Sequence, residues 1–119
     1  MPFKTILVNL MKSVPGSTGA ILADWEGEAV EQSCLYEIYD LKVIGAHKGI
    51  LLNLLKDAHQ KMEAGEMQHT VISTEKQHYL TGPVGPDYFL VMTLDRTAIV
   101  GLAIYHFQAA RERMYKEIY

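Results

Sequence analysis

The chain has 119 residues, of which 49% are hydrophobic, and its formal net charge is −3 at pH 7. This length suits one ordinary domain with a single core, so we expect one domain over residues 1–119. Positive and negative residues are interspersed, which argues against the basic surface that a nucleic-acid-binding or anionic-membrane-binding protein needs.

The first elements are predicted to be a helix and a β-hairpin. Apolar residues recur at helical spacing over residues 3–14, and a Pro-Gly pair then ends the pattern. Two strand-length runs follow, at 19–25 and 29–35, and Gly27 between them supplies the positive φ of a tight turn. A phosphate-binding loop is excluded here, because the Gly-Lys-Ser/Thr sequence of a P-loop is missing.

A long second helix is predicted over residues 41–65. Five of the six residues from 50 to 55 are apolar, and they cover more than half of the helix circumference. Part of this helix should therefore contact something besides its own sheet. Gly45, Gly49 and Leu52 share one row, and each glycine costs about 1 kcal/mol relative to alanine. The row indicates either tolerated substitutions or the close approach of a second helix in a dimer.

Three strand-like segments follow, at 67–74, 77–84 and 86–94, and a final helix has an apolar face over residues 99–114. An aspartate precedes each of the last two helices and is predicted to be its N-cap: Asp40 and Asp95. The order α-β-β-α-β-β-β-α with short connections predicts an α+β fold. Its five-stranded antiparallel sheet should carry helices on both faces.

The sequence shows no catalytic or metal-binding pattern. Cys34 lies in a predicted strand without the signature of a nucleophile, which favours a structural thiol. The predicted turn places Ser73 opposite His78, so His69 and His78 do not face each other. We expect no enzymatic activity, cofactor or metal. The lone cysteine, the missing leader pattern and the absence of roughly 18–20 consecutive apolar residues predict a cytoplasmic protein without membrane insertion.

The chain resembles the Roadblock dynein light-chain domain family over essentially its whole length. The similarity lies in the hairpin GAILADWEGEAV, the long second helix, the strand YFLVMTLDR and the segment AIVGLAIYHF. The resemblance implies a Roadblock-like, profilin-like fold and a homodimer in which the third strands pair and the second helices lie together. It also implies service as a scaffold or regulator of Ras-like small GTPases, as in bacterial polarity and motility, or as a subunit of motor and signalling assemblies.

Two sets of contact residues are expected. The strand at 67–74 contains no Asp, Glu, Lys or Arg, so no charge prevents its edge from pairing with another strand. The expected dimer interface comprises Gly45, Gly49, Leu52, Gln68, Thr70 and Ile72. The second helix also carries cationic side chains near apolar ones, which suits a buried anchor with a charged rim. The expected GTPase contacts are Lys48, Lys56 and His59.

A small-molecule sensor is the alternative hypothesis. Sheets backed by helices also form ligand pockets, and Tyr79, Tyr88 and Phe89 could line one. Ordinary strand packing is the other interpretation of these aromatic residues. A pocket closed by side chains would favour the scaffold.

Overall fold

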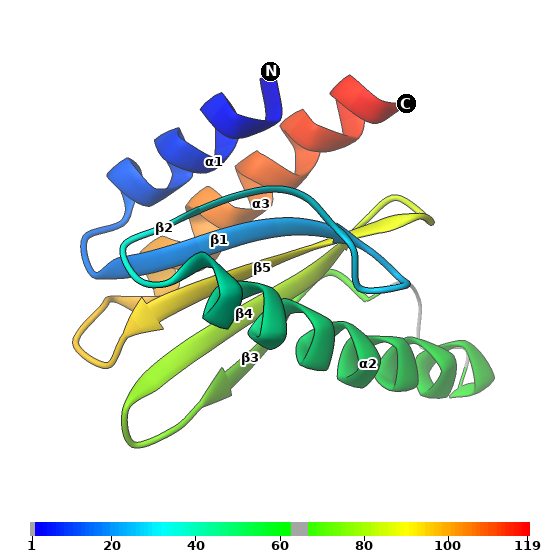
Figure 1. Ribbon diagram of the computed structural model, residues 1–119. Helices are drawn as coiled ribbons and strands as arrows, with labels where there is room; N and C mark the ends of the chain where they lie inside the picture. The colour runs from blue at the N-terminus through cyan, green and yellow to red at the C-terminus, as the bar shows by residue number, and fades with distance from the viewer. Residues whose placement is uncertain (1, 63–66) are drawn as a thin grey trace.

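The computed structural model describes residues 2–62 and 67–119 (Figure 1). The helices are α1 (Pro2–Ser13), α2 (Ile38–Met62) and α3 (Val100–Ile118). The strands are β1 (Ser17–Asp24), β2 (Ala29–Cys34), β3 (Thr70–Ser73), β4 (Gln77–Val84) and β5 (Tyr88–Asp95). The predicted element order is confirmed.

The strands form one antiparallel sheet in the order β2-β1-β5-β4-β3. Helices α1 and α3 lie side by side on one face, and α2 crosses the other face (Figure 1). The predicted α+β class and the predicted helices on both faces are therefore confirmed. Strands β2 and β3 form the two edges of the sheet.

The central strands are buried on both faces, which explains their continuous apolar runs. Along β1, Leu22 joins the core beneath α1 and α3, whereas its neighbour Ile21 joins the core beneath α2. Strand β5 divides Leu90 and Val91 in the same way. This alternation follows from the two-residue period of a strand. The larger core lies on the α1 and α3 face, and the smaller one holds α2 to the sheet.

The first hairpin turn forms as predicted. Gly27 has φ 92°, and its N–H donates to the carbonyl oxygen of Asp24 at 3.0 Å. The Trp25 ring lies 5.1 Å from the Phe89 ring, centroid to centroid, and Trp25 Nε1 donates to the carbonyl oxygen of Pro86 at 2.9 Å. Trp25 therefore links the β1–β2 turn to the β4–β5 turn.

Both predicted aspartate caps are wrong. Helix α2 begins before Asp40, which lies in its first turn, and the carbonyl oxygen of Glu37 accepts the helical hydrogen bond there. Helix α3 follows Ile99, which makes no side-chain cap bond. Asp95 instead ends β5, and its carbonyl oxygen accepts the N–H of Ala98 at 3.0 Å. A backbone turn is present at both positions, and the carbonyl oxygens of Glu37 and Asp95 accept its hydrogen bonds.

Candidate functional site

Two glycines bring the backbone of α2 close to the sheet. A Cβ atom at Gly45 would lie 3.4 Å from two methyl carbons of Ile21, and one at Gly49 would lie 2.5 Å from Phe89 Cζ. Leu52, the third member of the row, is only 1% exposed. The close approach that the glycines predicted is therefore made with the sheet of the same chain. Packing of a second helix on α2 stays a prediction, and it concerns other residues of this helix.

The opposite side of α2 carries exposed apolar side chains, here called the α2 outer face: Val43, Ile50, Leu51 and Leu54. Ile50 is 65% exposed and Leu54 is 64% exposed. The spacing from Val43 to Ile50 and Leu54 is i, i+7 and i+11, which places them along one helical stripe. The apolar surplus predicted for this helix is confirmed. Exposed stripes of this kind in soluble proteins commonly mark interaction surfaces.

Lys48 lies beside the sheet rather than on the outer face. Its Nζ atom is 4.3 Å from the centroid of the Tyr79 ring, a cation–π contact with β4. The side chains of Lys56 and His59, the other two expected GTPase contacts, lie outside the described residues. Contact of these three residues with a partner stays a prediction.

Strand β3 ends the strand order of the sheet, and among the described residues no further strand pairs with its outer side. Ser73 lies opposite His78, as the predicted turn requires. The Thr74 N–H donates to the carbonyl oxygen of Gln77 at 2.8 Å, so the alternation of an antiparallel ladder turns the backbone groups of Ile72 toward β4. Those of Val71 then point to the open edge. The four residues of β3 carry no charge that would obstruct another strand.

The edge strand is shorter than the predicted span of 67–74. Gln68 is exposed and precedes the strand, and its carbonyl oxygen lies 2.5 Å from where a Cβ of Gly82 would be. The His69 ring is held by α3, because Gln108 Nε2 donates to its Nδ1 at 2.9 Å. Of the predicted edge contacts, Thr70 and Ile72 lie in β3 and are half-buried, whereas Gln68 lies outside the strand.

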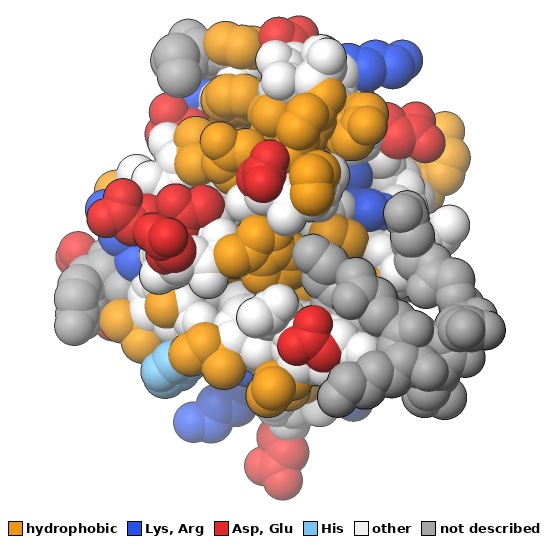
Figure 2. All heavy atoms as spheres, turned by 90° about the vertical axis from the view of Figure 1, so that its right-hand side faces the viewer, with side chains coloured by type: hydrophobic (Ala, Val, Ile, Leu, Met, Phe, Trp, Pro, Cys, Tyr) orange, Lys and Arg blue, Asp and Glu red, His pale blue; other side chains and the backbone are white. Residues whose placement is uncertain are grey.

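Apolar groups are also exposed at the end of the sheet that carries the β1–β2 and β4–β5 turns (Figure 1). Figure 2 shows this side of the molecule, and apolar side chains gather in the middle of the view. Tyr115 and Tyr119 at the end of α3 are 50% and 52% exposed, and their rings lie 4.9 Å apart. The Tyr119 hydroxyl donates to Asp87 Oδ2 at 2.8 Å. The α2 outer face is a separate surface, because α2 and α3 cover opposite faces of the sheet (Figure 1).

Several titratable groups have structural partners. The Cys34 thiol donates to the carbonyl oxygen of Tyr36 at 3.0 Å, and the buried His78 ring contacts Ser73 Oγ at 2.7 Å through Nδ1. Burial lowers the pKa of Arg111, whose Nε donates to a backbone carbonyl oxygen at 2.7 Å. Within the described ranges, His, Cys, Asp and Glu form no group of three that could hold a metal ion.

The three aromatic residues of the sensor hypothesis do not share a pocket. Phe89 is fully buried beneath Gly49, Tyr79 lies under Lys48, and Tyr88 packs against the core on the other face. A cavity of about 670 Å³ lies instead between α3 and the β4–β5 turn. Its lining includes none of these three aromatic side chains. Among the helices as far as they are described, none has the length and hydropathy of a membrane span.

The fold defines a class of small α+β domain of profilin-like architecture. Profilin IA from Acanthamoeba castellanii superposes with a TM-score of 0.61 at 12% identity, covering 98% of this chain and 99% of that chain. MglB from Myxococcus xanthus superposes with a TM-score of 0.89 at 14% identity, covering 99% and 95%. A Roadblock/LC7 domain from Streptomyces avermitilis gives 0.87 at 16% identity, covering 97% and 96%.

The sequence itself identifies the family. The Roadblock/LC7 domain model matches residues 4–94, and the chain belongs to the Roadblock/LC7 domain family. No curated protein matches the sequence. The resemblance noted from the sequence is therefore confirmed.

Proposed function

We propose that this chain is a noncatalytic homodimeric scaffold that regulates a Ras-like small GTPase. The observation that carries the proposal is the exposed apolar α2 outer face, together with the uncharged edge of β3 at one end of the strand order. An enzyme of this size would need converging reactive groups, whereas these two surfaces are suited to contacts with other chains. Family membership supports the class of partner.

The dimer follows from the edge of β3. The Val71 backbone groups that point outward can pair with β3 of a second copy about a two-fold axis, so that the two sheets continue into one. The two α2 helices then lie on the same face of the joined sheet. There, the exposed parts of Ile50 and Leu54 are available to a helix of the other copy or to a partner. Gly45, Gly49 and Leu52 contribute indirectly, because they pack α2 against its own sheet and so fix the position of the exposed side chains.

The proposed GTPase contacts remain Lys48, Lys56 and His59. Lys48 must exchange its contact with Tyr79 for one with the partner, and a cation–π contact at an exposed site contributes about 0.5–1 kcal/mol. That cost is small compared with the binding energy of a specific complex. A cytoplasmic location belongs to the same proposal and is supported by the free thiol of Cys34, the only cysteine.

The test is a titration of candidate Ras-like GTPases, loaded with GDP or GTP, into the purified protein. We expect tighter binding of one nucleotide state and at least a tenfold loss with Lys48→Glu, a difference of about 1.4 kcal/mol. Lys12→Glu is the matched control, because Lys12 lies in the last turn of α1 on the opposite face of the sheet. Equal affinity for both states would exclude regulation by nucleotide state. Absence of binding by every GTPase tried would refute the proposed partner class.

A further inference from the structure

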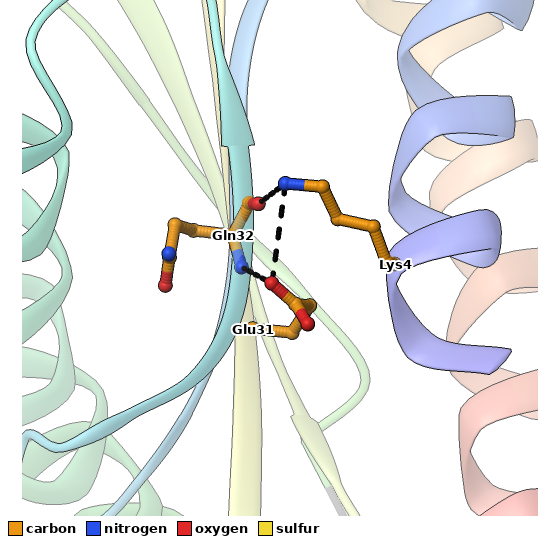
Figure 3. A network of polar contacts seen from close by, with 3 residues as sticks. All are labelled: Lys4, Glu31 and Gln32. Atoms are coloured by element: carbon orange, nitrogen blue, oxygen red, sulfur yellow. Dashed lines mark hydrogen bonds and ion pairs between the residues drawn. The ribbon is translucent and has the colours of Figure 1, made fainter. Parts of the chain in front are cut away.

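The two edges of the sheet are built differently. The β3 edge presents four uncharged residues, whereas the β2 edge lies beneath a lysine of α1 and carries a glutamate of its own. Figure 3 shows these side chains, Lys4 and Glu31, meeting at Gln32 in the middle of β2. The difference matters because an unprotected edge strand is a template for pairing with another copy of the chain.

The ladder shows which backbone groups of β2 face the edge. The Leu35 N–H donates to the carbonyl oxygen of Thr18 at 2.9 Å, which makes these residues a hydrogen-bonded pair with β1. Backbone groups alternate along an antiparallel strand, so Ser33 and Glu31 also turn theirs toward β1. The N–H and carbonyl of Gln32 consequently point away from the sheet. By the same alternation, the backbone groups of Val30 and Cys34 also face the edge, so Gln32 is the middle one of the three positions at which a sixth strand would bond.

Both outward groups of Gln32 are already occupied by side chains. The Gln32 N–H donates to Glu31 Oε1 at 3.2 Å, and the Gln32 carbonyl oxygen accepts a hydrogen bond from Lys4 Nζ. Lys4 Nζ also lies 3.9 Å from Glu31 Oε1, which links the two occupying groups to each other. The Glu31 side chain is 22% exposed and the Lys4 side chain is 48% exposed. The three residues form a closed network across the outer edge of β2 (Figure 3).

We propose that Lys4 and Glu31 close the β2 edge to a second copy of this chain, so that sheet extension is confined to β3 and assembly ends at two copies. An incoming strand would have to displace both side chains from Gln32 and leave their charges beside a new sheet interface, which is unfavourable. At β3, no side chain of residues 2–62 and 67–119, as far as these are described, bonds the outward Val71 groups, so no such displacement is needed there. The limit of two copies rests on the proposed dimer, whereas the closure of β2 does not.

The experiment compares the oligomeric state of the wild-type protein with that of Lys4→Met/Glu31→Thr. These changes keep an apolar stem at Lys4 and a strand-forming residue at Glu31 but free the Gln32 backbone. The control, Lys12→Met/Glu28→Thr, removes the same two charges at exposed positions whose side chains make no hydrogen bond or ion pair within the described part of the chain. Sedimentation velocity over a concentration series gives the mass, and hydrogen exchange of residues 29–34 locates any new pairing.

We expect the double variant to form species of at least twice the wild-type mass, with about tenfold tighter self-association and slowed exchange at the Gln32 amide. The control should match the wild type. A variant mass equal to that of the wild type, or growth without protection of β2, would overturn the proposal. If the double variant fails to fold, as judged by circular dichroism, Lys4→Met alone should shift association in the same direction, and an unchanged equilibrium would overturn it.

The wild-type result separates this inference from the proposed function. A monomeric wild type would refute the dimer through β3. The same experiment would still support closure of β2 if the variant then associated through residues 29–34.

Discussion

The two glycines of α2 should respond in opposite directions to the same substitution. Alanine is about 0.8–1.0 kcal/mol more favourable than glycine inside a helix. At Gly45 the added methyl group would lie 3.4 Å from the nearest atoms of Ile21, an ordinary contact distance. Gly45→Ala should therefore raise the free energy of unfolding by up to about 1 kcal/mol.

At Gly49 the same gain is opposed by overlap with the core. The added methyl group would lie 2.5 Å and 2.9 Å from two ring carbons of Phe89. This ring is fully buried, and Trp25 lies against it, so it cannot turn away without disturbing its neighbours. Overpacking of a filled core costs about 1–3 kcal/mol. After the helix gain is subtracted, Gly49→Ala should lower the free energy of unfolding by up to about 2 kcal/mol.

Urea unfolding followed by circular dichroism measures both variants, at one fixed protein concentration because self-association changes apparent stability. A double-mutant cycle with Phe89→Leu isolates the overlap, since the smaller side chain should make Gly49→Ala less harmful. We expect a coupling energy of about 0.5–3 kcal/mol between the two sites. If Gly49→Ala were as stable as Gly45→Ala, the reasoning from the Phe89 contact would be refuted.

Three further outcomes are expected. Val71→Pro should weaken self-association while the monomer keeps its fold, because it removes an outward N–H of β3; Val71→Thr keeps that N–H and is the sedimentation control. Leu54→Ser should weaken association about tenfold and change the stability of the monomer by less than about 0.5 kcal/mol, because Leu54 is 64% exposed; equal association in both proteins would remove it from the interface. Burial raises the pKa of the Tyr36 phenol above its ordinary value of 10.0, although its hydrogen bond to Thr93 acts in the opposite direction. The folded state therefore holds this proton after the unfolded state has lost it, and stability should fall as the pH rises above 10. Urea unfolding should show a smaller fall in stability above pH 10 for Tyr36→Phe than for the wild type. Tyrosinate absorbance follows the titration itself.

Much of the fold could be predicted because its signals are local. The turn at Gly27 needs a positive φ, and the period of the apolar residues changes between helical and strand-like where a helix and a strand follow each other. The register of β3 and β4 followed from the length of one turn, which placed Ser73 opposite His78. Such features depend on neighbours in the sequence, so the sequence alone determines them.

The contacts of α2 could not be assigned in the same way. Apolar residues lie on most of its circumference, so the period showed that Gly45, Gly49 and Leu52 share a row but not which neighbour the row faces. The neighbour that the row faces at Gly49 is Phe89, which lies forty residues away in the sequence. The contact between Lys4 and Gln32 likewise joins residues 28 positions apart and leaves no local pattern. Tertiary packing determines both.

The position of Trp25 provides an optical reporter of how α2 is seated. It is the only tryptophan in the chain, and its ring rests on the Phe89 ring that also lies beneath Gly49. Indole emission depends on the polarity around the ring, and here that environment is made by one hairpin turn, the carbonyl of Pro86 and the core under the helix. Lifting α2 from the sheet would expose Phe89 and change the surroundings of Trp25 while α1 and α3 keep their own core. The intrinsic fluorescence of the unmodified protein therefore distinguishes loss of the α2 face from global unfolding.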